Sequence, residues 1–188
     1  SIEESPELVE ACLGTIRWIL SNEKTRQAVI KADKKIVRNL VALMGRAAPS
    51  PGAKEQSIGC LRNLAIDTSL VPLLLKESSA SGAIEQIERG HPAAAESAAF
   101  FLASLANDDN VKDLLTKKET IRLLLKMMAS ATAKAPGGAE AAMKCLKQLC
   151  IKRANAKQLV VTLGAPAPLH ACLKIQNVRL RDAACQLL

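Results

Sequence analysis

The stretch Gly59-Cys-Leu-Arg-Asn-Leu-Ala65 carries the pattern on which the whole chain is built. Its two leucines are three positions apart, so in an α-helix they lie on one face, about a turn apart. Three other segments repeat this spacing, with an apolar residue, then Leu, then Leu or Ile three positions later: 11–16, 100–105 and 144–149. A fifth, partial copy covers 183–188.

The copies recur at a regular distance along the sequence. Their leading leucines are at positions 13, 61, 102 and 146, which gives intervals of 48, 41 and 44 residues. Periods of this size are typical of two- or three-helix units that stack side by side. We therefore expect an all-α fold made of repeats.

Each copy is followed by the same succession of segments. A short polar break, in which Ser, Asn and Asp are suitable N-caps, precedes a short apolar-periodic helix and then a second helix. The expected breaks are 21–23, 67–69, 107–110 and 152–155; the first helices are 25–31, 70–76, 111–117 and 156–163; the second helices are 34–44, 82–89, 119–130 and 167–175. A loop with Pro or Gly then leads to the next copy, and no sustained strand alternation is present.

These segments predict one array that spans residues 1–188. The predicted repeats are 1–20 (partial), 21–66, 67–107, 108–151 and 152–188. The sequence starts at Ser1 without a Met, and its last residues, 185–188, are apolar and resemble the middle of a helix, so we expect it to be a segment of a longer protein.

The composition is that of a helical protein with an aliphatic core. Hydrophobic residues make up 49% of the chain, but Trp18, Phe100 and Phe101 are its only aromatic residues. Trp18 does not fit the register of the signature, and we expect it to pack between helices. No apolar run approaches the ~20 residues of a membrane-spanning helix.

The six cysteines follow the repeat rather than a metal-binding pattern. Cys12, Cys60, Cys145 and Cys185 occupy similar points in successive copies, and no CxxC pair occurs. We expect buried free thiols, and hence a reducing compartment. The alternative is a disulfide or zinc role.

The stretch 59–65 resembles the third helix of armadillo repeats, which reads small-x-Leu-Arg-Asn-Leu-Ala. The segment 95–106 is similar to it, and an Asn/Asp cluster follows at 107–110. The resemblance, to armadillo proteins of the importin-α and β-catenin kind, covers nearly the whole chain. It implies a right-handed α-solenoid of about four three-helix repeats, with HEAT-type repeats as the alternative fold.

In the armadillo family, the third helices line a groove that binds extended peptides or partner helices. By resemblance, the position two after the leading Leu faces this groove, and here it holds Thr15, Asn63, Ser104 or Gln148. Asn63 is expected to hydrogen-bond a partner's backbone. The residues that the resemblance places in the groove are Arg62, Asn63, Phe100, Ser104, Lys144, Lys147 and Gln148.

Charge is concentrated toward the C-terminus. Residues 1–109 contain 12 Lys/Arg and 14 Asp/Glu, a net charge of −2, whereas residues 110–188 contain 14 and 4, a net charge of +10. Besides Lys144 and Lys147, a basic strip of Lys152, Arg153, Arg179 and Arg181 is expected. The charge predicts an acidic protein or peptide partner, against the alternative of a solvated basic face.

Three other functions remain open at this point. A nuclear-import-type adaptor would need Trp four residues before the groove Asn, but the pairs are Ala11/Thr15, Gly59/Asn63, Phe100/Ser104 and Lys144/Gln148. Nucleic-acid binding through the basic end would lack aromatic stacking residues. A structural role in a large assembly, through the convex face and the ends, is the third.

Motifs of catalysis are missing from the sequence. His91 and His170 have no Cys or carboxylate at metal-ligand spacing, and neither GxxxxGK[ST] nor GxSxG occurs. We expect a non-catalytic interaction scaffold with no catalytic residues, metal or cofactor. We expect it to be cytoplasmic, with a nuclear or cytoskeletal location as the alternative, and part of a larger complex.

Overall fold

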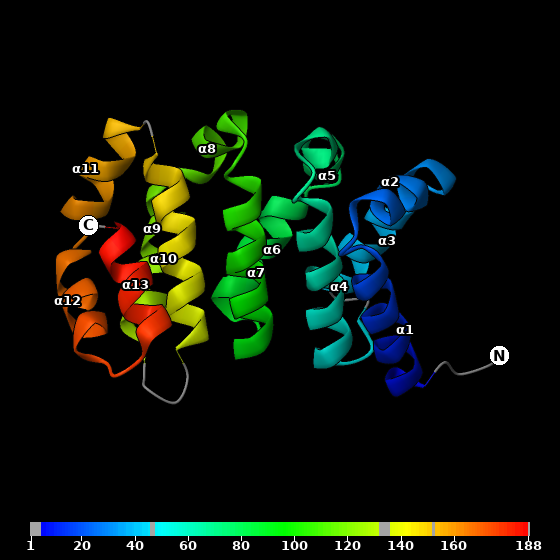
Figure 1. Ribbon diagram of the computed structural model, residues 1–188, viewed down its shortest axis with the longest axis horizontal. Helices are drawn as coiled ribbons and strands as arrows, with labels where there is room; N and C mark the ends of the chain where they lie inside the picture. Colours follow the sequence, from blue (N-terminus) through cyan, green and yellow to red (C-terminus); the bar gives the residue numbers. More distant parts are fainter. Residues whose placement is uncertain (1–4, 46–47, 132–135, 152, 188) are drawn as a thin grey trace. The chain divides into compact units, whose positions relative to one another are not determined.

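The computed structural model describes residues 5–45, 48–131, 136–151 and 153–187. All regular structure within these ranges is helical (Figure 1). The five helices that carry the signature, here called third helices, are α1 (Pro6–Ile19), α4 (Pro51–Leu64), α7 (Pro92–Leu105), α10 (Gly137–Cys150) and α13 (Val178–Leu187).

Two shorter α-helices precede each third helix after α1, and before α7 a short 3-10 helix, η1, comes ahead of the two. They are α2 (Glu23–Ala32) and α3 (Lys35–Met44); η1 (Thr68–Leu70), α5 (Val71–Lys76) and α6 (Ser79–Arg89); α8 (Asp109–Leu115) and α9 (Lys118–Ala129); and α11 (Ala154–Thr162) and α12 (Pro166–Lys174). The order of helices therefore confirms the predicted three-helix repeat, and most predicted helix ends lie within a few residues of the observed ones.

The chain divides into two compact units, Ser1–Phe101 and Leu102–Leu188, with the boundary inside α7. In unit 1, α4 packs against α1 on one side and against α3 on another, and α6 packs against α3 and α5. Figure 1 shows α1 and α4 side by side. Unit 1 thus contains one complete repeat, α2 to α4, flanked by α1 and by part of the next repeat.

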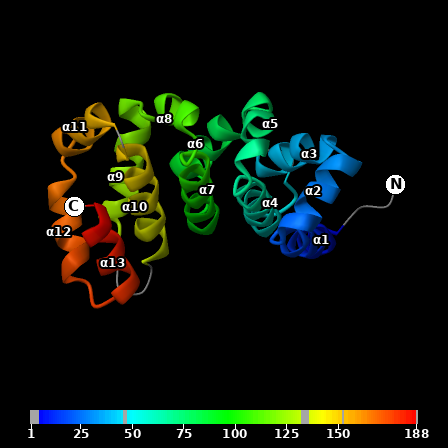
Figure 2. The same ribbon diagram turned by 45° about the horizontal axis from the view of Figure 1, so that its top comes forward.

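In unit 2, α10 lies at the centre. It packs against α9 and α13 and more lightly against α11, while α12 packs against α9 and α13. Figure 2 shows α10 and α13 as neighbouring third helices, with α12 on the other side of α13 from α10.

The signature leucines form the core of both units. Leu61 and Leu64 in unit 1, and Leu102 and Leu146 in unit 2, have no exposed surface, and Leu13 is 3% exposed. Leu61 and Leu64 are three positions apart on α4, so they belong to one buried stripe of that helix.

Polar side chains cap three of the first helices as predicted. The side-chain oxygen of Asn22 accepts from the backbone N–H groups of Lys24 and Thr25, and Asp67 and Asp108 accept in the same way from Ser69 and Asn110. Hydrogen bonds from Ser69 to the carboxylate of Asp67 lower the pKa of that group. The fourth break is different, because Arg153 precedes α11 and makes no side-chain cap.

The expectation that Trp18 packs between helices is wrong. Trp18 is 77% exposed. It follows the buried Leu13 by five positions, which is about 140° around the helix, so its side chain leaves α1 on the side away from the core.

The prediction of buried thiols holds for Cys60, Cys145, Cys150 and Cys172, but it is wrong for Cys12 and Cys185, which are exposed; all six are free. Burial raises the pKa of Cys60 to about 12, an effect that the nearby charge of Arg17 opposes. Burial likewise raises the pKa of Cys145 to about 12. These thiols therefore stay protonated at neutral pH and behave as small apolar side chains.

Within the described residues, no single helix is long and apolar enough to cross a membrane. The segments Pro51–Leu64 and Thr68–Lys76 reach that length only as a pair, and the pair is bent by 110°.

Candidate partner-binding surface

Third helices α1 and α4 are joined by a close packing of side chains over glycines. Gly52 and Gly59 are seven residues apart on α4, so they share one face, and Glu10 and Arg17 have the same spacing on α1. The Glu10 carboxylate lies over Gly52 and accepts a hydrogen bond from Ser50 Oγ at 3.2 Å. The stem of Arg17 lies over Gly59, where a Cβ would be 2.5 Å from Nε and 2.6 Å from Cδ.

Asn63 completes this contact. Its Nδ2 donates to the backbone oxygen of Arg17 at 2.8 Å. Arg17 is in the last turn of α1, where backbone carbonyls lack partners within the helix. The buried side chain of Arg26 donates to the next free carbonyls, those of Leu20 and Ser21, both at 3.1 Å. Asn63, the residue expected to hold a partner's backbone, thus binds the backbone of the neighbouring repeat.

Arg62 and Phe100 also join adjacent third helices. The guanidinium carbon of Arg62 lies 4.6 Å from the centroid of the Phe100 ring, a cation–π contact between α4 and α7. Both side chains are half-buried. The structure therefore brings these two predicted residues together, while Ser104, half-buried on α7, lies in the other unit.

In unit 2, Lys147 on α10 makes the corresponding contact to α13. Its Nζ donates to Gln186 Oε1 at 3.0 Å. Lys147 and Arg62 each directly follow the leading Leu of their own third helix. Lys147 contacts Gln186 as Arg62 contacts Phe100, so Gln186 on α13 occupies the position that Phe100 occupies on α7. In this alignment of the third helices, the residue of α13 equivalent to the buried Cys60 is Leu187 and not Cys185. Cys185 therefore does not occupy the buried position of Cys60, and it is exposed.

A polar groove of about 350 Å³ runs between α10 and α13. It is lined by Glu140, Lys144, Arg179, Asp182, Ala183 and Gln186. Its two carboxylates are engaged within the groove: Lys144 Nζ donates to Glu140 at 2.7 Å, and Gln186 Nε2 donates to Asp182 at 2.8 Å. Lys144 and Arg179 thus line this groove, Lys147 contacts Gln186 at its edge, and Gln148 on α10 is half-buried.

The predicted basic strip is not one continuous surface. Arg153 turns toward α8, where its Nη1 donates to Asp113 at 2.7 Å and its Nη2 to the backbone oxygen of Asp109 at 3.0 Å. Arg179 lines the polar groove. Arg181 is exposed on α13 but does not line it. Lys152 lies outside the described residues.

The charge of the chain belongs to unit 2. Residues 1–101 contain 12 Lys/Arg and 12 Asp/Glu, so unit 1 is neutral. Residues 102–188 contain 14 and 6, so the net charge of unit 2 is +8, which is the whole net charge of the protein.

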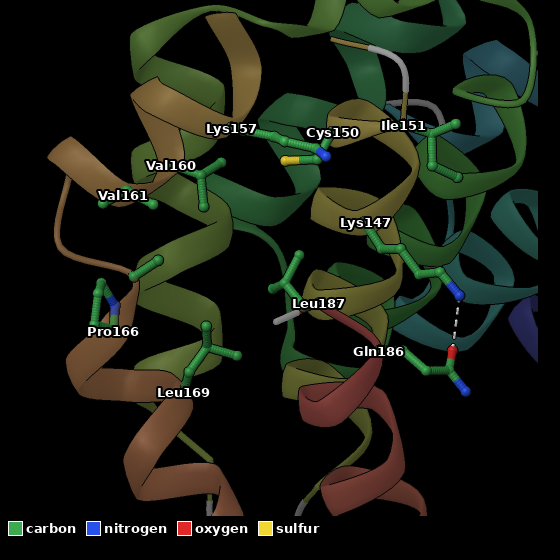
Figure 3. Close-up of a pocket in the computed structure, with 11 residues that line it drawn as sticks. Lys147, Cys150, Ile151, Lys157, Val160, Val161, Pro166, Leu169, Gln186 and Leu187 are labelled. Atoms are coloured by element: carbon green, nitrogen blue, oxygen red, sulfur yellow. Dashed lines mark hydrogen bonds between the residues drawn. The ribbon is translucent and has the colours of Figure 1, made fainter. Parts of the chain in front are cut away.

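Beyond Gln186, the polar groove gives way to an apolar pocket of about 410 Å³ between α10, α11, α12 and α13. Figure 3 shows Val160, Val161, Pro166 and Leu169 on one side of it and Lys147, Ile151 and Gln186 on the other. Val160 and Leu169 form its floor at 4% and 5% exposure, whereas Val161 is 61% exposed. Its volume is at the lower end of the range of small-ligand sites, about 300–1,000 Å³.

The described part of the chain contains no candidate metal centre. No three side chains of His, Cys, Asp or Glu there are grouped so that they could hold a metal ion. His91 and His170 are both exposed, on different units. The arrangement described above offers cationic and apolar contacts to a bound molecule.

The fold is that of armadillo repeats. An engineered protein solved by crystallography matches 100% of this chain and 76% of its own, with a TM-score of 0.86 and 16% identity. A designed armadillo repeat protein matches 98% and 76%, with a TM-score of 0.83 and 16% identity. Another, solved in complex with the peptide (KR)4, matches 98% and 76%, with a TM-score of 0.81 and 17% identity.

At such low identity these likenesses concern the fold alone. No protein-family model matches the chain, and no curated protein matches it. The resemblance drawn from residues 59–65 is thereby confirmed as an armadillo-like, all-α repeat fold.

The sequence reasoning missed Glu10 and Arg17 at the α1–α4 contact of unit 1, and Lys157, Val161 and Gln186 at the sites of unit 2. The seven-residue spacing shared by Gly52 and Gly59 with Glu10 and Arg17 was a usable signal for the first contact. Residue spacing did not reveal Gln186 or the pocket. The sequence alignment had matched Cys185 with the cysteines of the other copies, and this placed the last copy of the signature wrongly.

Proposed function

We propose that this protein is a non-catalytic interaction module that binds an acidic segment of a partner protein along the α10–α13 side of unit 2. The observation that carries the proposal is the charge partition: unit 1 is neutral and unit 2 carries +8. Opposite charge steers association and disfavours partners of like charge.

The groove supplies the contacts for such a segment. Arg179 lines it, Lys147 donates to Gln186 at its edge, and its two carboxylates accept hydrogen bonds from Lys144 and Gln186. A carboxylate-bearing segment would there meet three cations, those of Lys144, Lys147 and Arg179, against two carboxylates, those of Glu140 and Asp182. The designed relative binds the basic peptide (KR)4; the charge of unit 2 favours the opposite sign here.

The test is a binding titration with a fluorescent eight-residue peptide of alternating Glu and Asp. We expect Lys147→Glu and Arg179→Glu each to weaken binding about tenfold and the double variant to weaken it further, because each reverses a charge at the groove. Lys31→Glu, an exposed position on α2 of unit 1, is the matched control and should bind as the unchanged protein does.

Raising the salt concentration should weaken binding, as it does for exposed charges. Equal binding by Lys31→Glu, Lys147→Glu and Arg179→Glu would refute the groove. Binding of the peptide (Lys-Arg)4 in preference to the acidic one would refute the predicted sign of the partner.

A single-stranded oligonucleotide serves as the competing probe. The basic unit alone would attract phosphates, but its α10–α13 surface has no aromatic side chain on which bases could stack. We expect the acidic peptide to remain bound when the oligonucleotide is added at equal charge concentration.

A further inference from the structure

We propose that the apolar pocket between α10, α11, α12 and α13 is an anchor site for an apolar side chain of the bound acidic segment. This inference rests on the proposed function and adds to it a hydrophobic specificity. The partner it defines is a short segment in which one or two large aliphatic residues are flanked by carboxylates.

The charge of the pocket supports an acidic occupant. Lys147 and Lys157 are its two charged lining residues, and none of the described residues that line it is Asp or Glu. The ammonium of Lys147 is hydrogen-bonded to the neutral Gln186, so its charge is not cancelled by that contact. Lys157 is exposed. An anion at the rim would meet these two cations, while Asp182 lies beyond Gln186 in the polar groove.

The floor of the pocket supports an aliphatic anchor. Val160, Leu169 and Leu187 line it together with Cys150. Burial raises the pKa of the Cys150 thiol, and the nearby charge of Lys157 opposes this, so the thiol is neutral at physiological pH. The pocket therefore has an apolar interior below a cationic rim.

The rim carries aliphatic surface that a bound side chain would cover. Ile151 is 36% and Val161 61% exposed. Two exposed aliphatic side chains beside an open apolar cavity form a surface whose burial stabilises a complex. An acidic segment without an anchor would leave this surface in water.

Gln186 links the pocket to the polar groove. It lines both, and it is hydrogen-bonded to Lys147 on one side and to Asp182 on the other. A segment that places its carboxylates near Arg179 and Lys147 can thus extend its next side chain past Gln186 into the pocket. The two sites form one amphipathic surface.

The test compares two labelled peptides of equal charge, Asp-Glu-Leu-Leu-Glu-Asp and Asp-Glu-Ser-Ser-Glu-Asp. Seating one leucine in the pocket should make the first peptide bind about tenfold more tightly. Ile151→Ser and Val161→Ser should each reduce this ratio, and together they should bring it close to one. Both residues are exposed, so the fold should persist, which circular dichroism checks.

Val178→Ser is the matched control. Val178 is 76% exposed on α13 and does not line the pocket, so its replacement should leave the ratio at about ten. Lys157→Gln is expected to weaken both peptides alike, because it removes a rim charge and leaves the apolar floor intact.

The outcomes separate this inference from the proposed function. Failure of the serine peptide to bind would overturn the proposed function. Equal binding of the two peptides, or a leucine preference that survives in Ile151→Ser/Val161→Ser, would overturn the anchor site alone. A dimer in light scattering that the same double variant dissociates would also overturn it, because the occupant would then be a second copy of the chain.

Discussion

At the residue scale, the armadillo signature is used here to join repeats. Asn63 is the residue for which the sequence most favoured a partner contact, yet its amide nitrogen donates to Arg17 O, 46 positions earlier. Sequence spacing could not show this, because the acceptor is a backbone carbonyl at the end of another helix. The exposure of Trp18, in contrast, could have been predicted from the sequence. It follows from the angle between Trp18 and Leu13 around α1, which depends only on the number of residues between them.

Replacing Asn63 tests its structural role. Asn63→Ala removes the donor to Arg17 O and should lower the free energy of unfolding by about 1 kcal/mol, the usual contribution of such a hydrogen bond. The measurement is urea denaturation followed by circular dichroism. Asn39→Ala, at an exposed position of α3, corrects for the difference in helix propensity between Asn and Ala.

A result in which Asn63→Ala and Asn39→Ala are equally stable would mean that the Asn63–Arg17 bond does not contribute in solution. Asn63 would then be available for a partner, as its place in the signature suggests.

At the scale of the helices, order and type could be predicted from periodicity, and helix starts from capping residues. The apolar period of the third helices fixes which face is buried, and Asn22, Asp67 and Asp108 fix where the first helices begin. The distance between third helices could not be predicted, since it depends on which side chains lie over Gly52 and Gly59 on the neighbouring helix.

Two glycines with opposite surroundings test this close packing. Gly59→Ala would place a Cβ against Nε and Cδ of Arg17, and the resulting overpacking should destabilise unit 1 by about 1–3 kcal/mol. Gly14→Ala meets nothing within 4 Å and should stabilise α1 by about 0.5–1 kcal/mol, because alanine favours the helix. Thermal and urea denaturation measure both.

The source of the Gly59→Ala effect can be identified with a second substitution. Arg17→Ala removes the side chain that lies over Gly59, so in this background Gly59→Ala should cost less than it does alone. An additive double variant would show that Arg17 does not pack on Gly59.

At the scale of the whole molecule, the sequence predicted the armadillo-like repeat fold, and the structural likenesses confirm it. It also predicted the basic C-terminal part, whose boundary nearly coincides with the division between units inside α7. The distribution of that charge could not be predicted, because Arg153 pairs with Asp113, 40 positions earlier, and so leaves the expected strip. Lys144 and Arg179 line the groove, and Lys147 contacts Gln186 at its edge.

The most direct test of the proposed acidic-partner surface is hydrogen exchange measured by mass spectrometry, with and without the peptide Asp-Glu-Leu-Leu-Glu-Asp. Binding slows exchange where it stabilises local structure. We predict slower exchange in segments from α10 (Gly137–Cys150) and α13 (Val178–Leu187), with α1 (Pro6–Ile19) and α2 (Glu23–Ala32) unchanged. Protection confined to unit 1, or none in α10 and α13 at saturating peptide, would contradict the account.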